Sequence, residues 1–377
     1  MRTFSAAASS RNNHFNLMRV VAAMAVLIGH NGMLINYVPP WEGFLIHYGT
    51  ATGVIAVDVF FVISGFLVTA SLFNRGSTVA FLSARFLRIF PGLWAMLILV
   101  VFGLGLALTT EPARAYLASP VTWRFLWRWG TIVNGFANFL PGLFEHNPAE
   151  AKVNGSLWTI TVEWRLYMIL AVGWFALGFA RTWRAVLFRA AIPLVALALF
   201  VRLLFAADVD GGAQHSYFFF AGSTIYLLGD RIRVSSRVIL PLLALLAVAL
   251  IDTRAFFIAY LAVVPLLTLN LAYAPGERLL QFNRIGDYSY GLYIYAYPIT
   301  QALIAIHPGV TFGALNLLSV PLTLIPAALS WRLIEKPALA RKQALALVVS
   351  RGLTGLRAFA QRLARAKDQP ARTGERP

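Results

Sequence analysis

Cysteine is absent from the 377 residues of this chain, and its absence excludes several kinds of chemistry. Disulfide bridges, zinc sites built on thiolates and covalent intermediates on cysteine all require a side chain that the sequence lacks. No spacing of His, Asp and Glu resembles a metal-binding motif either, so no metal site is expected. Any reaction must therefore depend on other side chains.

Charge is also scarce, because charged residues make up 12% of the chain and hydrophobic residues 59%. Soluble domains average about 25% charged residues, so this chain has too little charge to cover a soluble surface. The apolar residues form runs along the whole chain. The first run is too long for a signal peptide and no small-residue cleavage site follows it, so we expect it to remain as a membrane span.

The apolar runs predict the fold class. A helix of about 20 mostly apolar residues is long enough to cross a membrane, and the sequence contains ten such segments. We predict an all-α bundle of about ten transmembrane helices over residues 1–340, followed by a basic tail, 341–377, that is partly an amphipathic helix. The predicted spans are 15–37, 51–74, 79–108, 156–179, 185–206, 216–230, 237–251, 254–274, 287–306 and 311–334.

Residues 111–155 do not fit the pattern of the spans. Trp123, Trp127 and Trp129 alternate with Arg124 and Arg128 there, which is typical of a helix lying at the membrane interface. An eleventh span in this segment is the alternative.

Acidic residues are few, 15 against 32 Lys and Arg, giving a net charge of +17. Such an excess can indicate nucleic-acid binding, but here the basic residues lie in short loops and in the tail, so no nucleic-acid partner is expected. Basic short loops are typical of the cytoplasmic side of a membrane protein, and this pattern places both termini in the cytoplasm. The basic residues assigned to that side before the tail are Arg2, Arg11, Arg75, Arg181, Arg184, Arg189, Arg231, Arg233, Arg237, Arg278 and Arg284.

Three arginines lie inside the spans near the predicted cytoplasmic face. Ionisable residues within spans are costly and tend to be functional. Arg19 is about one turn into the first span, and Arg85 and Arg88 lie at the inner end of the third. The spacing of Arg85 and Arg88 puts both on one helix face, where paired guanidinium groups suit phosphate. The alternative is that they anchor the end of the span at the interface.

A second group of ionisable residues is predicted nearer the outer face. His30, Asp58 and Glu163 each lie about 10 Å below the outer boundary at 1.5 Å per residue. A histidine with carboxylates at the same depth could exchange protons with a substrate, although a buried network that only holds helices together is the alternative. His30 follows Arg19 by eleven positions, about three turns, so both lie on one helix face.

Other polar residues are weaker candidates. Ser64 and Ser156 are conceivable nucleophiles, but a small residue beside glycine commonly serves close helix packing in lipid. Trp158 and Trp164 could stack on a sugar ring or anchor the interface. The remaining histidines are expected in terminal or loop regions exposed to solvent: His14, His47, His146, His215 and His307.

Six motifs in order give the sequence a family resemblance. It resembles the acyltransferase-3 family of membrane acyltransferases over residues 15–340. The motifs are NLMRVVAAMAVLIGH (16–30), VDVFFVISGFLVT (57–69), RFLRIFPGLW (85–94), NGSLWTITVEW (154–164), IGDYSYGLYIYAYP (285–298) and RLIEKP (332–337).

The resemblance implies a ten-helix bundle that uses cytoplasmic acyl-CoA, with acetyl-CoA as the expected donor. It implies that Arg85 and Arg88, with Arg19 nearby, hold the donor, and that His30 activates a hydroxyl or relays the acyl group. Glu163 occupies the position of the family's acidic residue. Two positions depart from the family pattern, because Ala296 stands where many relatives have histidine and Trp164 where they have a second acidic residue.

The predicted function is that of a membrane O-acetyltransferase in the inner membrane of a bacterium. The resemblance implies an acceptor outside the cytoplasm, such as O-antigen, lipopolysaccharide, another surface polysaccharide or a lipid-linked sugar. Two alternatives stay open at this point. One is a transporter or flippase of the same pathway, which would also bury charges at two depths. The other is a scaffold in a glycan-assembly complex.

Overall fold

A computed structural model describes residues 3–8, 10, 12–75, 77–132, 137–149, 151–180, 182–206 and 208–367. Arg2, Arg11, Arg181 and the end of the predicted tail (368–377) lie outside these residues. Every named element of the described residues is helical, and one isolated bridge joins Thr3 to Arg233. The all-α prediction is therefore confirmed.

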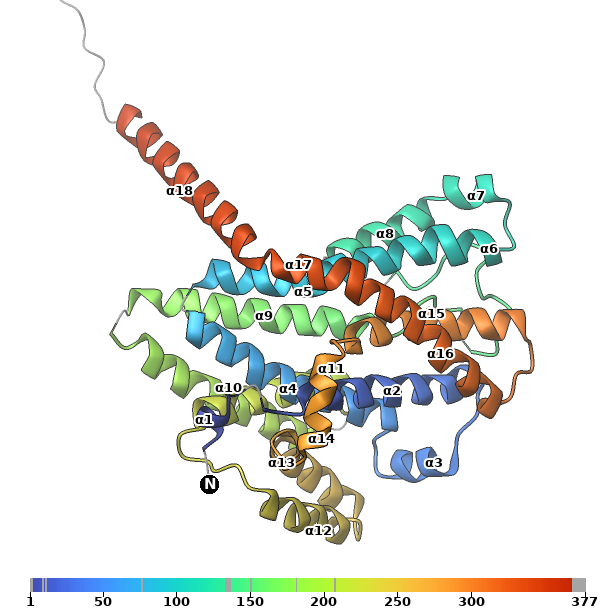
Figure 1. The fold of residues 1–377 in the computed structure, drawn as a ribbon, viewed down its shortest axis with the longest axis horizontal. Coiled ribbons are helices and arrows are strands. Elements are labelled where there is room, and N and C mark those ends of the chain that lie inside the picture. Colours follow the sequence, from blue (N-terminus) through green and yellow to red (C-terminus); the bar gives the residue numbers. More distant parts are fainter. Residues whose placement is uncertain are drawn as a thin grey trace, which may run out of the picture.

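Most of the long helices form one bundle, with α3, α6 and α7 towards one end of it and α18 projecting from the other (Figure 1). The helices are α1 (Phe4–Ala8), α2 (Phe15–Leu34), α3 (Pro40–His47), α4 (Thr52–Arg75), α5 (Thr78–Ile98), α6 (Leu106–Leu108), α7 (Ala113–Ala118), α8 (Pro120–Thr131), α9 (Trp158–Ala176), α10 (Arg184–Phe205), α11 (Gly211–Leu227), α12 (Ile239–Ala249), α13 (Thr253–Ala272), α14 (Glu277–Leu280), α15 (Ser289–Ile306), α16 (Phe312–Ser330), α17 (Lys336–Ala340) and α18 (Lys342–Lys367). Two π-helical segments, Leu99–Gly105 and Trp331–Glu335, continue α5 and α16.

Seven of the described helical segments are long and apolar enough to cross a membrane. They coincide with seven predicted spans. Helices also occupy the other three places, but α11 and α12 have only 17 and 11 residues, and the 18 residues of α15 are rich in tyrosine. The count of ten therefore stays a prediction. The seven segments are Phe15–Leu34, Thr52–Asn74, Thr78–Leu108, Trp158–Phe179, Arg184–Phe205, Thr253–Ala272 and Phe312–Ala340.

The segment 111–155 contains two short helices, α7 and α8. Helix α8 has 12 residues, about 18 Å at 1.5 Å per residue, which is too short for the hydrocarbon core of a membrane. Phe125 and Trp129 are buried on one face of it, whereas Trp123 and Trp127 are exposed. None of the described helices in this segment could provide an eleventh span, and α8 has the two-faced character expected at an interface.

The predicted tail helix is present as α18, whose 26 residues leave the bundle after α17 (Figure 1). Several large apolar side chains of α18 are exposed, including Val348 and Leu356. An exposed apolar face on a basic helix is the pattern expected of a helix that lies on an anionic membrane surface.

Helices α4 and α11 approach each other closely, because glycine occupies points of contact between them. A Cβ atom at Gly65 would lie 1.8 Å from the carbonyl oxygen of Phe219, and one at Gly222 would lie 2.2 Å from that of Val62. Small residues permit this backbone contact between helices in a membrane. Asp58 precedes Gly65 by seven residues, nearly two full turns, so Asp58 also faces α11.

We predict that Gly65→Ala lowers the midpoint of thermal unfolding of the purified protein strongly. The added methyl group has no room at the α4–α11 contact, and overpacking of this kind costs about 3 kcal/mol. Gly313→Ala is the matched control, since a Cβ atom at Gly313 in α16 meets nothing within 4 Å. Equal midpoints for the two variants would contradict the packing described here.

Candidate active site

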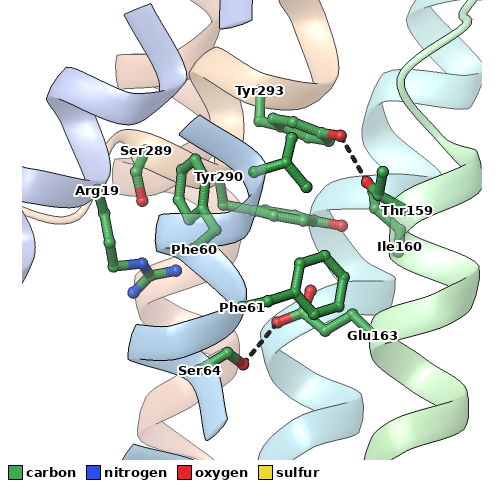
Figure 2. Close-up of a pocket in the computed structure, with 11 residues that line it drawn as sticks. Arg19, Phe60, Phe61, Ser64, Thr159, Ile160, Glu163, Ser289, Tyr290 and Tyr293 are labelled. Atoms are coloured by element: carbon green, nitrogen blue, oxygen red, sulfur yellow. Dashed lines mark hydrogen bonds between the residues drawn. The ribbon is translucent and has the colours of Figure 1, made fainter. Parts of the chain in front are cut away.

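Two adjoining cavities lie inside the bundle. We call the first the arginine cavity; its volume is about 50 Å³ and its lining includes Arg19, Ser64, Glu163 and Tyr290 (Figure 2). We call the second the histidine cavity; its volume is about 350 Å³ and its lining includes His30, Ser156, Trp158 and His215. Both cavities are lined by Val57, Thr159 and Tyr293.

A hydrogen bond of 2.5 Å joins Thr159 Oγ1 to the hydroxyl of Tyr293 at this shared wall (Figure 2). The same tyrosine hydroxyl also donates to the carbonyl oxygen of Ser156 at 3.0 Å. Side chains from α9 and α15 thus form part of the wall that the two cavities share.

Two of the three predicted donor-binding arginines are held by a carboxylate that the sequence analysis did not single out. Asp287, in the turn before α15, accepts a hydrogen bond from Arg19 Nη1 at 2.9 Å and from Arg88 Nη2 at 2.7 Å. Arg88 Nη1 also lies 3.7 Å from Glu335, which is almost fully buried. These ion pairs join α2 and α5 to the turn before α15 and to the π-helical segment that follows α16.

Asp287 carries the shared counter-charge of two guanidinium groups, those of Arg19 and Arg88. The side chains of Arg19 and Asp287 are partly buried, and that of Arg88 is 11% exposed. A charge held away from water is strongly destabilising when it loses its partner, so Asp287 is an important element of the fold at this end of the bundle.

Arg85 differs from its neighbours in having no carboxylate partner among the described residues. Its guanidinium group lies over the ring of Tyr167, with 5.8 Å between Cζ and the ring centroid. Its Nε atom is buried and makes no hydrogen bond to the described residues. Arg85 and Arg88 thus share a helix face but have different partners, and Arg85 keeps the greater capacity to bind an added anion.

Glu163 is bound to side chains on its own helix and on α4. Ser64 Oγ donates to Glu163 Oε1 at 3.1 Å, and the hydroxyl of Tyr167 donates to the same oxygen. Figure 2 shows Glu163 and Ser64 on one side of the arginine cavity and Arg19 on another. The structure therefore places Glu163 with Arg19 at the arginine cavity, whereas His30 lines the histidine cavity.

His30 is half-buried near the C-terminal end of α2 and lines the histidine cavity. Its Nδ1 atom lies 3.5 Å from Ser156 Oγ, at the limit of a hydrogen bond. The ring of Tyr297 packs edge-on against the imidazole, with 5.2 Å between centroids. Arg19 and His30 thus line adjoining cavities, as their shared helix face predicts.

Asp58 is fully buried, and among the described residues its hydrogen bonds go to side chains other than His30. Its carboxylate accepts three hydrogen bonds of 2.7 Å, from Gln214 Nε2, the hydroxyl of Tyr260 and Nδ1 of His215. The structure therefore does not bring Asp58 together with His30, although the sequence predicts both at a similar depth. The physical reason is the direction in which the Asp58 side chain projects, because Asp58 lies on the side of α4 that packs against α11. Equal depth in a membrane does not imply contact.

His215 was expected in a solvent-exposed loop, and that expectation is also wrong. Helix α11 begins at Gly211, because Asp210 caps it by accepting from the amides of Gly212 at 3.1 Å and Ala213 at 3.2 Å. His215 therefore lies in the second turn and is 3% exposed. A signal was present in the sequence, since His215 precedes Gly222 by the same seven residues that separate Asp58 from Gly65.

The other histidines divide into two groups. His14 is 5% exposed and its Nε2 atom lies 2.9 Å from the carbonyl oxygen of Ala274, so its predicted exposure is wrong. His47, His146 and His307 are exposed, as expected.

The guanidinium group of Arg85, which has spare hydrogen-bonding capacity, lies near the arginine cavity and is suited to bind an anionic group. The imidazole side chains of His30 and His215 line the histidine cavity. These imidazoles are suited to proton transfer or to nucleophilic attack by nitrogen.

Comparison with known proteins agrees with this chemistry. The sequence matches the profile of a family described as an acyltransferase domain over residues 12–332. It is 31% identical over 349 residues to an O-acetyl transferase of Shigella phage Sf6, in an alignment covering 88% of this chain and 97% of the relative. It is 28% identical over 369 residues to Nodulation protein 10 of Rhizobium leguminosarum bv. viciae, covering 89% of this chain and 96% of that protein. No solved structure matches the chain.

We predict that Asp287→Asn destabilises the protein by about 3 kcal/mol, because it leaves Arg19 and Arg88 without their shared counter-charge. Asp230→Asn is the matched control. Asp230 pairs with Arg189 at 3.9 Å, but both side chains are more than half exposed, and such pairs contribute about 0–1 kcal/mol. Thermal unfolding of the purified variants measures the difference, and similar losses in both would show that the Asp287 pairs are not important for stability.

Proposed function

We propose that this chain, which belongs to the acyltransferase-3 family, transfers an acetyl group from cytoplasmic acetyl-CoA to a hydroxyl of an extracytoplasmic glycan or lipid-linked sugar. Family membership confirms the resemblance carried by the six motifs, and it makes the chain a transferase of acyl groups other than aminoacyl groups. The donor, the acceptor, the site residues and the location in a bacterial inner membrane belong to the proposal. The observation that carries it is the pair of adjoining cavities, one lined by Arg19 and the other by His30.

The donor is proposed to bind at the end of the bundle that contains Arg85. Coenzyme A carries several phosphate groups, and arginine binds phosphate through paired hydrogen bonds. Arg85 supplies an unpaired buried Nε atom, so it is assigned the principal contact with the donor. Arg19 and Arg88 add positive charge nearby, but Asp287 already holds both. Their role is to keep the donor site positive and correctly shaped.

The acyl group must then travel from the arginines towards His30. His30 follows Arg19 by eleven positions in α2, about 16 Å along the helix axis, and the flexible pantetheine arm of CoA is long enough for that distance. The route passes the wall formed by Val57, Thr159 and Tyr293. The arginine cavity holds only about 50 Å³, so we expect these side chains to move when the thioester enters.

The transfer itself is assigned to the histidine cavity. The hydroxyl oxygen of the acceptor forms a bond to the acyl carbon, the bond from that carbon to sulfur breaks, and CoA leaves as the thiol. His30 acts as a base in this step or carries the acyl group on a ring nitrogen between two steps. Ser156 lies close enough to His30 Nδ1 to orient the ring.

An acceptor that contains sugar is supported by two features. One relative is named as an O-acetyl transferase, and acetylation of oxygen requires a hydroxyl. The lining of the histidine cavity also includes Tyr37, Trp41 and Trp158, whose rings offer flat apolar faces to a sugar. Trp164, the other predicted stacking residue, packs against Phe90 with 5.1 Å between centroids, so Trp158 is the better candidate.

The proposal predicts different defects for His30→Ala and Arg85→Ala. His30→Ala should lower acetylation of the surface glycan about 10²-fold or more, the usual effect of losing a proton-transfer group, while binding of acetyl-CoA to the purified protein is largely kept. Arg85→Ala should weaken acetyl-CoA binding. NMR of the glycan measures acetyl esters in cells, and Arg278→Ala, at an exposed position in α14, is the control for loss of a basic side chain.

Full acetylation in His30→Ala, with normal amounts of protein in the membrane, would contradict the role of His30. Equal weakening of donor binding by His30→Ala and Arg85→Ala would contradict the separation into two sites. Movement of an unmodified lipid across the membrane, with no ester formed, would instead favour a transporter.

A further inference from the structure

We propose that His215, held by Asp58, is the catalytic base that takes the proton from the hydroxyl of the acceptor. This inference rests on the proposed function and names a residue for one step of it. It assigns Asp58 a role as a positioning residue that acts through His215.

The carboxylate of Asp58 fixes the state of the imidazole. It is buried and accepts from His215 Nδ1, Gln214 and Tyr260, each at 2.7 Å. An ionised carboxylate can only accept hydrogen bonds, so the proton of a neutral His215 resides on Nδ1 and Nε2 carries the lone pair. No hydrogen bond from the described residues reaches Nε2, which leaves this atom able to accept a proton.

Two aromatic side chains pack against the ring and hold it in place. Phe61 stacks on it with 5.0 Å between centroids and an interplanar angle of 10°, and Trp158 lies 5.3 Å away at 31°. His215 nevertheless lines the histidine cavity. A fixed ring with one defined tautomer beside a substrate-sized cavity is the arrangement that general-base catalysis requires.

His30 lines the same cavity but lacks this support. Its polar contact among the described residues is with Ser156 at 3.5 Å, and no carboxylate pairs with it. A base becomes positively charged when it takes a proton, and a buried positive charge needs a counter-charge. Asp58 supplies one to His215 alone. His30 is therefore better suited to remain neutral and to receive the acyl group on nitrogen or orient the thioester.

The proton of the acceptor hydroxyl passes to Nε2 of His215 while the hydroxyl oxygen forms its bond to the acyl carbon. The bond from that carbon to the leaving atom, the sulfur of CoA or a ring nitrogen of His30, breaks with its electron pair. His215 then passes its proton on to the leaving group, so the enzyme returns to its starting state.

A purely structural role for the Asp58–His215 pair is the alternative, since the pair joins α4 to α11. Kinetics separate the two roles. We predict that His215→Gln lowers kcat for transfer to the glycan about 10²-fold or more with little change in KM for acetyl-CoA. Asp58→Asn should also lower kcat, and the double variant should be no slower than His215→Gln, because residues that act as one unit are not additive.

The experiment uses the purified full chain in lipid nanodiscs with acetyl-CoA and with glycan isolated from cells that lack the protein. His14→Gln is the matched control, because His14 is also a buried, hydrogen-bonded histidine but lies outside both cavities. His215→Phe is a second variant that keeps the aromatic stack and removes both nitrogens. Acetyl-CoA binding checks that each variant is folded.

Wild-type kcat in a folded His215→Gln or His215→Phe variant would overturn the inference and leave the proposed function standing. The inference would also be overturned if the loss of kcat in the double variant equalled the product of the losses in the two single variants. Absence of any transfer by the wild-type protein, with donor and acceptor present, is a separate result that would overturn the proposed function itself.

Discussion

The constraint on which this structure depends is that a charge buried among membrane helices must have a partner. Asp287 meets this requirement for Arg19 and Arg88, and Asp58 meets it for His215. Each carboxylate lies where helices distant in sequence come together, so pairing of charge and assembly of the bundle are one process. Because unpaired buried charge is so costly, the atoms left without partners, above all Arg85 Nε, mark the places where a ligand is expected.

Close packing of α4 against α11 makes the pairing of Asp58 with His215 possible. Gly65 and Gly222 bring the two backbones together, and the side chains two turns earlier, Asp58 and His215, then meet at 2.7 Å. The pair lies at the edge of the histidine cavity, whereas Glu163 and Ser64 lie at the arginine cavity. The two cavities thus differ in chemistry because different levels of the same face of α4, together with different neighbouring helices, line them, and this difference is the physical basis for assigning the donor to one cavity and the acceptor to the other.

The sequence alone predicts the helices well and the contacts between them poorly. Hydropathy locates helices at all ten predicted places, and helical periodicity relates Arg19 to His30 correctly, because both depend on local geometry. Depth in the membrane did not identify the partner of Asp58, since a residue at a known depth can still face any of several helices. The partners Asp287 and Glu335 lie about 200 residues or more from Arg88 in sequence, so only the assembled bundle reveals them. Helix α11 was placed too late because the polar residues after Asp210 look like a loop.

The most direct test of the account is the sidedness of the reaction. Proteoliposomes that contain the full chain would be loaded with acetyl-CoA labelled in the acetyl group, and the glycan acceptor would be added outside. Transfer from an internal donor to an external acceptor would give labelled acetyl ester on the external glycan, with no labelled ester when the vesicles contain His30→Ala. Ester formation only when donor and acceptor are on the same side of the membrane would contradict transfer between the two cavities.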